Sequence, residues 1–252
     1  MDNQTLKLMK EHRSIRKYKE LMVSDKTVST ITESAQQAAF ASQLYSVVYT
    51  DKKPIPFGAP LLFTFLIDLH KFERIMEIRN WKWVTNDIFS FILAIQDGSY
   101  FAQNFVLAAE SLGLGTCFLG YAPYSAKKIK EDFKLPDRTF PFVLLTLGYP
   151  DEDPPVRPRY PLEYTLFKDE YPNLSDKLVN SAMKKMDEGY LKEDYYRKLN
   201  AKIPLQGEKK DPCDYSNYSW TEHICRKWGQ WNSDYKKISD NLKQFGIDFK
   251  EE

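Results

Sequence analysis

Residues 102–120, AQNFVLAAESLGLGTCFLG, join the end of a long apolar helix to a strand. Upstream of this stretch, apolar residues recur at steps of three and four from Ile88 onward, which predicts a helix over about residues 85–112 that ends at Gly113. At ~1.5 Å per residue this helix would span ~42 Å, longer than a compact domain requires. Because it is apolar around much of its circumference, it needs a second covering surface, either a partner subunit or the rest of the same monomer.

Shorter elements surround this helix, and helices and strands alternate irregularly. Helices are predicted over residues 5–12, after the N-cap residue Ser24 and near Ser125, and residues 13–18 are predicted to be extended. Strand composition is found at four places, residues 44–49, 61–68, 116–120 and 140–148. The second of these strands is almost wholly apolar, which predicts a central strand that is buried on both faces.

The character of the chain changes after residue 150. Five prolines, at positions 150, 154, 155, 158 and 161, predict an extended, loop-like run, because each removes a backbone donor and fixes φ. Helical patterns follow at about 175–190 and 219–246, but the apolar pattern there is too thin to predict a separate core. We therefore expect a core of residues 1–165 and a C-terminal helical extension, residues 166–252, that packs on a partner subunit.

The composition is that of an ordinary soluble protein: of 252 residues, 42% are hydrophobic and 28% are charged, with a net charge of +1. This balance of charges argues against a nucleic-acid-binding protein. Three cysteines, Cys117, Cys213 and Cys225, lie far apart without a CxxC pair, which indicates plain thiols rather than disulfides or a zinc site. The N-terminus is polar, and the longest near-apolar stretch, residues 88–95, is well short of the ~20 residues of a membrane span. We expect a cytoplasmic protein that binds neither nucleic acid nor membrane.

Two basic clusters are candidate anion-binding sites, and the first is His12-Arg13-Ser14-Ile15-Arg16. In an extended segment alternate side chains share a face, so His12, Ser14 and Arg16 would point one way. An imidazole, a hydroxyl and a guanidinium together suit a phosphate or a polyol. The alternative interpretation is a solvated basic segment that follows a helix.

The second cluster is the run VRPRYP at residues 156–161, in which prolines keep the chain extended and project Arg157 and Arg159 to one side. Arginine suits bidentate contacts to an oxyanion, but a pair of arginines screened by water fits the pattern as well. The glycines of residues 111–120 follow a helix rather than a strand, so they do not form the dinucleotide-binding fingerprint. Gly120 marks either a close approach of the backbone to a ligand or a simple turn.

Five motifs, in order along the chain, carry a resemblance to a known family. They are HRSIRKY at 12–18, AQN…AAESLGLG at 102–115, FLG at 118–120, VRPRYP at 156–161 and SWTEHI at 219–224. Together they make the chain similar to the NADPH nitroreductases and NADPH–flavin oxidoreductases of the nitroreductase family, over nearly its whole length. The resemblance implies an α+β sandwich with a central, mostly antiparallel sheet flanked by helices. It also implies an intertwined homodimer, with a C-terminal arm exchanged between subunits and FMN bound at the interface.

For the phosphate end of FMN, the resemblance implies five contact residues. His12, Arg13 and Ser14 would hold the phosphate and the ribityl chain. Arg157 and Arg159 would close on the phosphate, and this pair keeps both positive charges of the family's pattern.

For the ring end of FMN, the resemblance implies five more. Arg16 would lie near the pyrimidine edge of the flavin, where a positive charge favours the anionic reduced form. Phe118 and Gly120 would lie beside the ring, Gly120 through its backbone, and Tyr121 follows them where close relatives often have a second glycine. Ser42 matches a serine-rich loop that touches the flavin from the other subunit.

Two further departures from the family's pattern bear on substrates. Tyr45 stands where the family usually has a Gln. Residues 198–217 are longer and richer in Lys than the resemblance predicts, and they fall where these enzymes recognise the 2′-phosphate of NADPH. Arg197 is the nearest candidate for that contact, so the choice between NADPH and NADH as co-substrate stays open.

The function implied is hydride transfer from NADPH or NADH through bound FMN to a nitro compound, a quinone or free flavin, in two half-reactions that share one pocket. The flavin supplies the chemistry, and the sequence shows no Ser–His–Asp order, no paired carboxylates and no metal-ligand spacing. His70 and His223 are expected to be structural. One alternative is a flavoprotein of the same fold with a dedicated substrate, as in reductive dehalogenation, for which residues 198–217 would be the lid. Another is an interaction protein without cofactor, in which both basic clusters are solvated.

Overall fold

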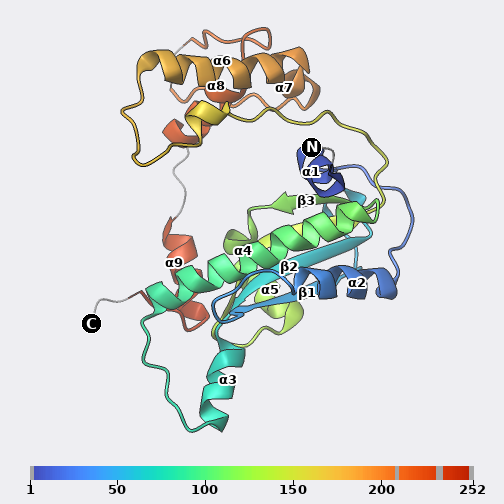
Figure 1. The fold of residues 1–252 in the computed structure, drawn as a ribbon, viewed down its shortest axis with the longest axis vertical. Helices are drawn as coiled ribbons and strands as arrows, with labels where there is room; N and C mark the ends of the chain where they lie inside the picture. The colour runs from blue at the N-terminus through green and yellow to red at the C-terminus, as the bar shows by residue number, and fades with distance from the viewer. Residues whose placement is uncertain (1–2, 208–209, 231–234, 250–252) are drawn as a thin grey trace. The chain divides into compact units, whose positions relative to one another are not determined.

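The computed structural model describes residues 3–207, 210–230 and 235–249, and Figure 1 traces them along the chain. These residues form two compact units. Residues up to 154 form the first unit together with the C-terminal residues from 235 onward, and the residues between them form the second. Each unit has buried side chains of its own.

Within its described residues, the first unit is built on four antiparallel strands in the order β1-β2-β4-β3. The strands are β1 (Tyr45–Thr50), β2 (Leu61–Asp68), β3 (Gly115–Leu119) and β4 (Thr139–Gly148). All four lie where the sequence predicted them, to within a residue. β2 runs between β1 and β4, and every residue of β2 except Leu62 is buried, which confirms the predicted central strand.

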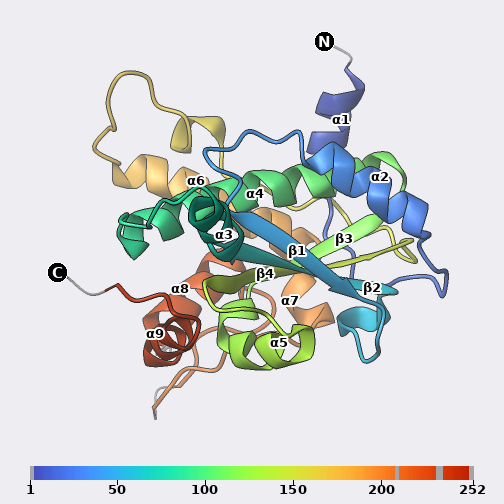
Figure 2. The same ribbon diagram turned by 90° about the horizontal axis from the view of Figure 1, so that it is seen from below.

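Helices cover both faces of this sheet, as Figure 2 shows. On one face, α2 (Asp25–Ala35) and α4 (Asp87–Ser111) pack on the aromatic side chains of β2. On the other face lie α5 (Ala126–Phe133) and α9 (Tyr235–Gln244). Successive strand residues point to opposite faces, so each face carries its own apolar core. The expected α+β sandwich is confirmed.

α4 is the longest helix of the described residues, with 25 residues. Asn86 caps its first turn by accepting a hydrogen bond from the N–H of Phe89 at 2.8 Å. The C-cap residue is Leu112, and Gly113, which the sequence predicted as the cap, follows it with φ +76°. One side of α4 packs on the sheet, whereas Ile88, Phe89 and Ile92 are about half exposed. Neither α4 nor any other helix in the described parts of the chain is long and apolar enough to cross a membrane.

Short elements complete the first unit. They are α1 (Gln4–Lys10), α3 (His70–Ile78) and the 3-10 turns η1 (Pro56–Gly58) and η2 (Ala122–Ser125). The sequence did not predict α3. Phe72, Ile75 and Met76 recur at helical spacing, but the N-cap residue, Leu69, has no side-chain acceptor, so only the capping signal of a helix is absent.

The second unit consists of helices and loops. Its elements are η3 (Leu162–Tyr164), α6 (Asp176–Lys192), α7 (Tyr195–Lys198) and α8 (Trp220–Gln230). Tyr196 and Tyr218 are buried, and the Tyr196 ring stacks on His223 with the ring centroids 4.5 Å apart. The sequence led us to expect no core here. The structure differs because stacked rings replace the aliphatic stripes that periodicity detects. That this part packs on a partner subunit stays a prediction.

Arg138 fixes the C-terminal segment to the first unit. Its guanidinium pairs with Glu73 of α3 at 2.7 Å and with Asp87 of α4 at 2.8 Å, and donates to the carbonyl of Gly246 at 2.8 Å. The Asp87 carboxylate also accepts the N–H of Asp248 at 2.9 Å. The predicted helical region 219–246 is therefore two helices, α8 and α9, in different units, and residues 231–234 lie outside the described residues.

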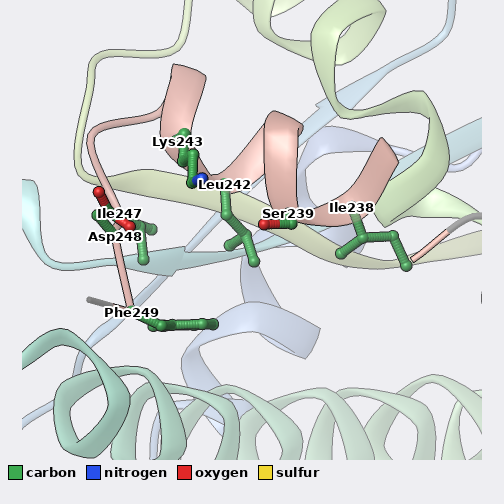
Figure 3. Close-up of a pocket in the computed structure, with 7 residues that line it drawn as sticks. All are labelled: Ile238, Ser239, Leu242, Lys243, Ile247, Asp248 and Phe249. Atoms are coloured by element: carbon green, nitrogen blue, oxygen red, sulfur yellow. The ribbon is translucent and has the colours of Figure 1, made fainter. Parts of the chain in front are cut away.

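α9 and the segment after it line a groove of about 440 Å³, shown in Figure 3. Ile238, Leu242 and Phe249 give this groove an apolar wall. The Phe249 ring packs edge-on against Phe91 of α4, with the centroids 5.2 Å apart. The C-terminal residues thus extend the core on the α9 face of the sheet.

Candidate functional site

Residues 13–16 run along the outer edge of β3. Ser14 forms a parallel bridge with Thr116, and the N–H of Ile15 donates to the carbonyl of Thr116 at 2.8 Å. Ile15 also packs against Gly115, where a Cβ atom would lie only 2.6 Å from the Ile15 side chain. Glycine at 115 therefore permits the close approach that keeps the basic segment extended on the sheet.

The basic side chains of this segment differ in their partners. His12 Nδ1 lies 2.6 Å from Glu110 Oε1, and Arg13 forms an ion pair with Asp153. Arg16 is different. Its backbone N–H donates a hydrogen bond to the Glu152 carboxylate, but its guanidinium has no hydrogen bond or ion pair among the residues that the structure describes. Arg16 is exposed, so its charge is available to a ligand.

Two titratable groups beside Arg16 stay neutral. Burial raises the pKa of the Cys117 thiol, against the opposing effects of the Arg16 charge and a hydrogen bond from Ser14. Burial likewise raises the pKa of Tyr18, whose hydroxyl donates to the carbonyl of Ile15 at 2.7 Å. Neither group becomes an anion near neutral pH, so neither cancels the charge of Arg16.

Phe118, expected beside the flavin ring, lies near the end of β3, and Gly120 and Tyr121 follow directly after this strand. Phe118 and Tyr121 are exposed, at 37% and 44%, although both are aromatic. A Cβ atom at Gly120 would meet nothing within 4 Å, so its backbone faces open space. Ser14, Arg16 and these three residues thus all lie along or just beyond one edge strand, and their contacts with a flavin stay a prediction.

Tyr121 also lines a cavity of about 1100 Å³ in the first unit, which the sequence did not predict. Residues 49–56, part of β2 and α5 form most of its wall, and Met22, Val23, Asp25, Ser125 and Leu144 complete it. Lys53 lies there with its Nζ bonded to the carbonyls of Gly58 and Ala59, and the buried Thr64 hydroxyl has no partner in the described part of the chain. The only signal in the sequence was the proline-rich turn between two strands.

Ser42 lies in the loop before β1 and is half-buried. Its backbone N–H is bonded, but its hydroxyl makes no hydrogen bond with the described residues. Its predicted contact with the flavin of another subunit stays a prediction.

In the second unit, Arg157 and Arg159 lie in different surroundings. Arg157 pairs with Glu193, and its guanidinium lies 4.0 Å from the centroid of the Tyr195 ring. Arg159 donates to the backbone carbonyls of Arg157 and Pro158 and has no acidic partner among the described residues. Of these two arginines, only Arg159 is therefore without a carboxylate partner among the described residues.

Described residues of the Lys-rich segment 198–217 are bonded to α8. Arg226, 4% exposed, makes a bidentate pair with Asp211 at 2.7 and 2.8 Å, and Lys202 pairs with the same carboxylate at 2.8 Å. Hydrogen bonds from Arg226 and Lys202 lower the pKa of Asp211. Arg197, the candidate for the 2′-phosphate, lies 3.4 Å from Asp194.

Comparison with known proteins agrees with the fold. The model of the nitroreductase family matches residues 48–149. A chromium(VI) reductase of Pseudomonas sp. (strain G-1) is 31% identical over 179 residues, which cover 65% of this chain and 74% of the relative. An NADPH-dependent oxidoreductase of Staphylococcus haemolyticus is 30% identical over 220 residues, which cover 80% of this chain and 87% of the relative. The chain belongs to the nitroreductase family. This confirms the resemblance drawn from the five motifs.

Two further comparisons extend the likeness. The solved structure of NfrA2 from B. megaterium superposes with a TM-score of 0.84 over 99% of this chain and 100% of that one, and at 23% identity it shows the shared fold. An FMN reductase (NADPH) of Bacillus subtilis is 26% identical over 212 residues, 77% of this chain and 84% of the relative.

Proposed function

We propose that this member of the nitroreductase family is a cytoplasmic, homodimeric, FMN-dependent NAD(P)H oxidoreductase. Hydride would pass from NADPH or NADH through bound FMN to nitro compounds, quinones or free flavin. The observation that carries the proposal is the Arg16 guanidinium, unpaired among the described residues, on the edge of β3 beside Ser14 and the open backbone of Gly120. The oxidoreductase class and the FMN cofactor agree with the names of the NADPH-dependent relatives.

The residues present fit the chemistry of FMN. A phosphate and a polyol need hydrogen-bond donors and positive charge, which His12, Arg13 and Ser14 offer on one extended segment. A flavin ring needs flat apolar contacts and backbone donors, which Phe118 and Gly120 offer at the end of β3. Tyr121 would flank the ring from the wall of the cavity.

Arg16 would hold the pyrimidine edge of the ring. Its charge is not cancelled by the neutral thiol of Cys117 or the neutral phenol of Tyr18. A charge-assisted hydrogen bond from a guanidinium contributes ~1.5–3 kcal/mol, and it is strongest when the acceptor is negative. Arg16 would therefore stabilise negative charge at that edge of the ring.

When bound, FMN supplies the hydride chemistry at its N5 atom. The protein binds, orients and limits access. The cavity of about 1100 Å³ shares Tyr121 with this site, but its wall does not include Arg16, Phe118 or Gly120, so we place the substrate pocket at the open backbone of Gly120 instead. If nicotinamide and acceptor use one pocket beside the flavin in turn, the two half-reactions cannot overlap.

The exposed side of α4 supports the homodimer. Ile88, Phe89 and Ile92 lie about half exposed along successive turns, and Phe40 in the loop before β1 is 55% exposed. Exposed apolar side chains on one helix, such as Ile88, Phe89 and Ile92, are typical of a protein interface. Such an interface would bring the Ser42 loop of one subunit to the flavin of the other.

A flavoprotein with a dedicated substrate is less well supported. That alternative needs residues 198–217 to act as a lid. The bonds of Arg226 and Lys202 to Asp211 hold described parts of this segment in place. An interaction protein without cofactor would have both basic clusters solvated, whereas Arg157 is paired and partly buried.

Purification tests the proposal. The protein should be yellow and contain about one FMN per subunit, and flavin released by denaturation should be identified as FMN by chromatography. Protein stripped of flavin should regain the colour when FMN is added. Colourless protein that takes up no added FMN would contradict the proposed function.

A further inference from the structure

Asp97 is a buried carboxylate in the middle of α4, and its residue is 1% exposed. Its Oδ1 atom accepts the backbone N–H of Ala41 at 2.6 Å, and its Oδ2 atom accepts those of Ser42 at 3.0 Å and Leu44 at 3.1 Å. No cation forms an ion pair with Asp97 in the described parts of the chain. Backbone donors of one loop therefore compensate this buried charge, as in an anion-binding nest.

The loop of residues 41–44 has a shape that needs this support. Gln43 has φ +52°, in the left-handed region that residues with a side chain rarely adopt. Three of the four N–H groups of the loop converge on the Asp97 carboxylate. At the far end, the carbonyl of Leu44 accepts the N–H of Asp68 at 2.9 Å, which ties the loop to β2. The loop is thus fixed between α4 and the sheet.

The same bonds leave the side chains of the loop free for other partners. Asp97 takes the backbone donor of Ser42, while the Ser42 hydroxyl has no partner among the described residues. Gln43 is exposed, and its amide group likewise makes no hydrogen bond with them. The loop therefore presents polar side chains on a backbone that cannot easily move.

We propose that Asp97 is a positioning residue that holds Ser42 ready for the flavin of the partner subunit. This inference rests on the proposed function, in which Ser42 contacts FMN across the dimer. Asp97 touches neither substrate nor cofactor; it acts through the backbone of the loop. Because α4 also carries the exposed Ile88 and Ile92, one helix links the predicted dimer interface to the loop.

An isosteric substitution tests this role. Asp97→Asn keeps the size of the side chain but turns an amide donor toward N–H groups that need an acceptor. The dissociation constant for FMN should rise at least tenfold, measured by flavin fluorescence on dimeric protein whose fold is checked by circular dichroism. The matched control is Asp87→Asn, another α4 carboxylate, which accepts the N–H of Asp248. It should lower thermal stability and leave FMN affinity within threefold. Affinity within threefold for Asp97→Asn as well would overturn the proposal.

A double-mutant cycle separates positioning from general damage. If Asp97 acts through Ser42, combining Asp97→Asn with Ser42→Ala should weaken FMN binding by at most threefold more than the worse single variant. Losses that multiply in full would show that the two residues act independently, which would overturn the proposal.

Amide hydrogen exchange tests the role of Asp97 on the unsubstituted protein, so the result does not depend on whether a variant folds. The amides of Ala41 and Ser42 should exchange at least tenfold more slowly than that of Gln43, their neighbour without a bond to Asp97. If the amides of Ala41, Ser42 and Gln43 all exchange equally fast in a protein that binds FMN, the positioning role of Asp97 is wrong, but the proposed function still stands. Failure of that protein to take up FMN would contradict the proposed function.

Discussion

Arg16 in the first unit and Arg157 in the second have opposite surroundings. The Arg16 guanidinium has no partner among the described residues, and its neighbour Arg13 pairs with Asp153, whose side chain is 87% exposed. An ion pair so exposed contributes only ~0–1 kcal/mol. An entering phosphate could displace Asp153 at little cost. The first segment is therefore arranged to receive an anion.

Arg157 is held more firmly. Its partner Glu193 is 17% exposed, and the Tyr195 ring lies under the guanidinium. Cation–π contacts contribute ~0.5–2 kcal/mol, more when water is excluded. Arg157 therefore supports its own unit and offers less to a ligand, while Arg159 is free of carboxylates among the described residues. The comparison shows that two arginines with the same charge can differ in how freely their guanidiniums can bind a ligand.

The largest expected effect comes from removing both charges of the second segment. The double substitution Arg157→Ala with Arg159→Ala should raise the FMN dissociation constant by about two orders of magnitude. Most of this loss comes from Arg159, whose charge-assisted bond contributes ~1.5–3 kcal/mol at ~1.4 kcal/mol per tenfold, and Arg157, which pairs with Glu193, adds less. Flavin fluorescence titration measures this. The control removes two exposed lysines of the same unit, Lys177→Ala with Lys185→Ala. Affinity within threefold of the unsubstituted protein would show that only the first segment holds the phosphate.

Removing Arg16 alone should have the next largest effect. Arg16→Ala should weaken FMN binding by about 10- to 100-fold, because one charge-assisted hydrogen bond of ~1.5–3 kcal/mol is lost. Lys19→Ala, an exposed cation of the same segment, is the control and should change affinity less than threefold. Equal effects of the two substitutions would mean that general charge, not the position of Arg16, attracts the flavin.

Removing the acids should change the two regions in opposite ways. Asp153→Asn frees Arg13 and should tighten FMN binding by up to ~5-fold, the equivalent of ~1 kcal/mol for an exposed pair. Glu193→Gln leaves a partly buried Arg157 unpaired and should lower the thermal midpoint instead. Titration and thermal unfolding measure the two outcomes. Weaker FMN binding by Asp153→Asn would count against an anion site at residues 12–16.

The smallest effect concerns pH and the second unit. Burial, and to a lesser degree the charge of Lys227, lowers the pKa of His223 below its ordinary value of 6.5. The unfolded chain then takes up a proton below about pH 6.5 while the folded unit stays neutral, so stability falls as the pH drops through this range. The thermal midpoint should decrease by a few degrees, on the order of 1 kcal/mol or less, and His223→Gln should flatten the trend. An unchanged slope in that variant would exclude His223 as the cause.

Local sequence signals predicted most helices and strands, because the residues that cap a helix or form a strand lie within a few positions of one another. Ser24 caps α2, accepting the N–H of Thr27 at 3.1 Å, and the apolar run of β2 becomes the central strand. The motif at 12–18 and the strand after Gly113 were both predicted, and the structure brings them together.

Contacts between distant residues could not be predicted in this way. Asp97 meets Ala41 across 56 positions, and Arg157 meets Glu193 across 36. No local pattern in the sequence marks either pair. The sequence therefore showed which basic residues form the two clusters, but not which of them are free to bind a ligand. The sequence did not predict the aromatic core of the second unit for a similar reason, because stacked rings have no fixed spacing along the chain.

Anaerobic reduction of the FMN-loaded protein tests the central claim most directly. NADPH or NADH should bleach the flavin absorbance with no acceptor present. After the nucleotide is removed by desalting, a nitroaromatic compound or a quinone should restore the colour, and double-reciprocal plots at several acceptor concentrations should be parallel. Intersecting lines, with no re-oxidation until nucleotide is added back, would contradict a hydride stored on the flavin between two half-reactions in one pocket.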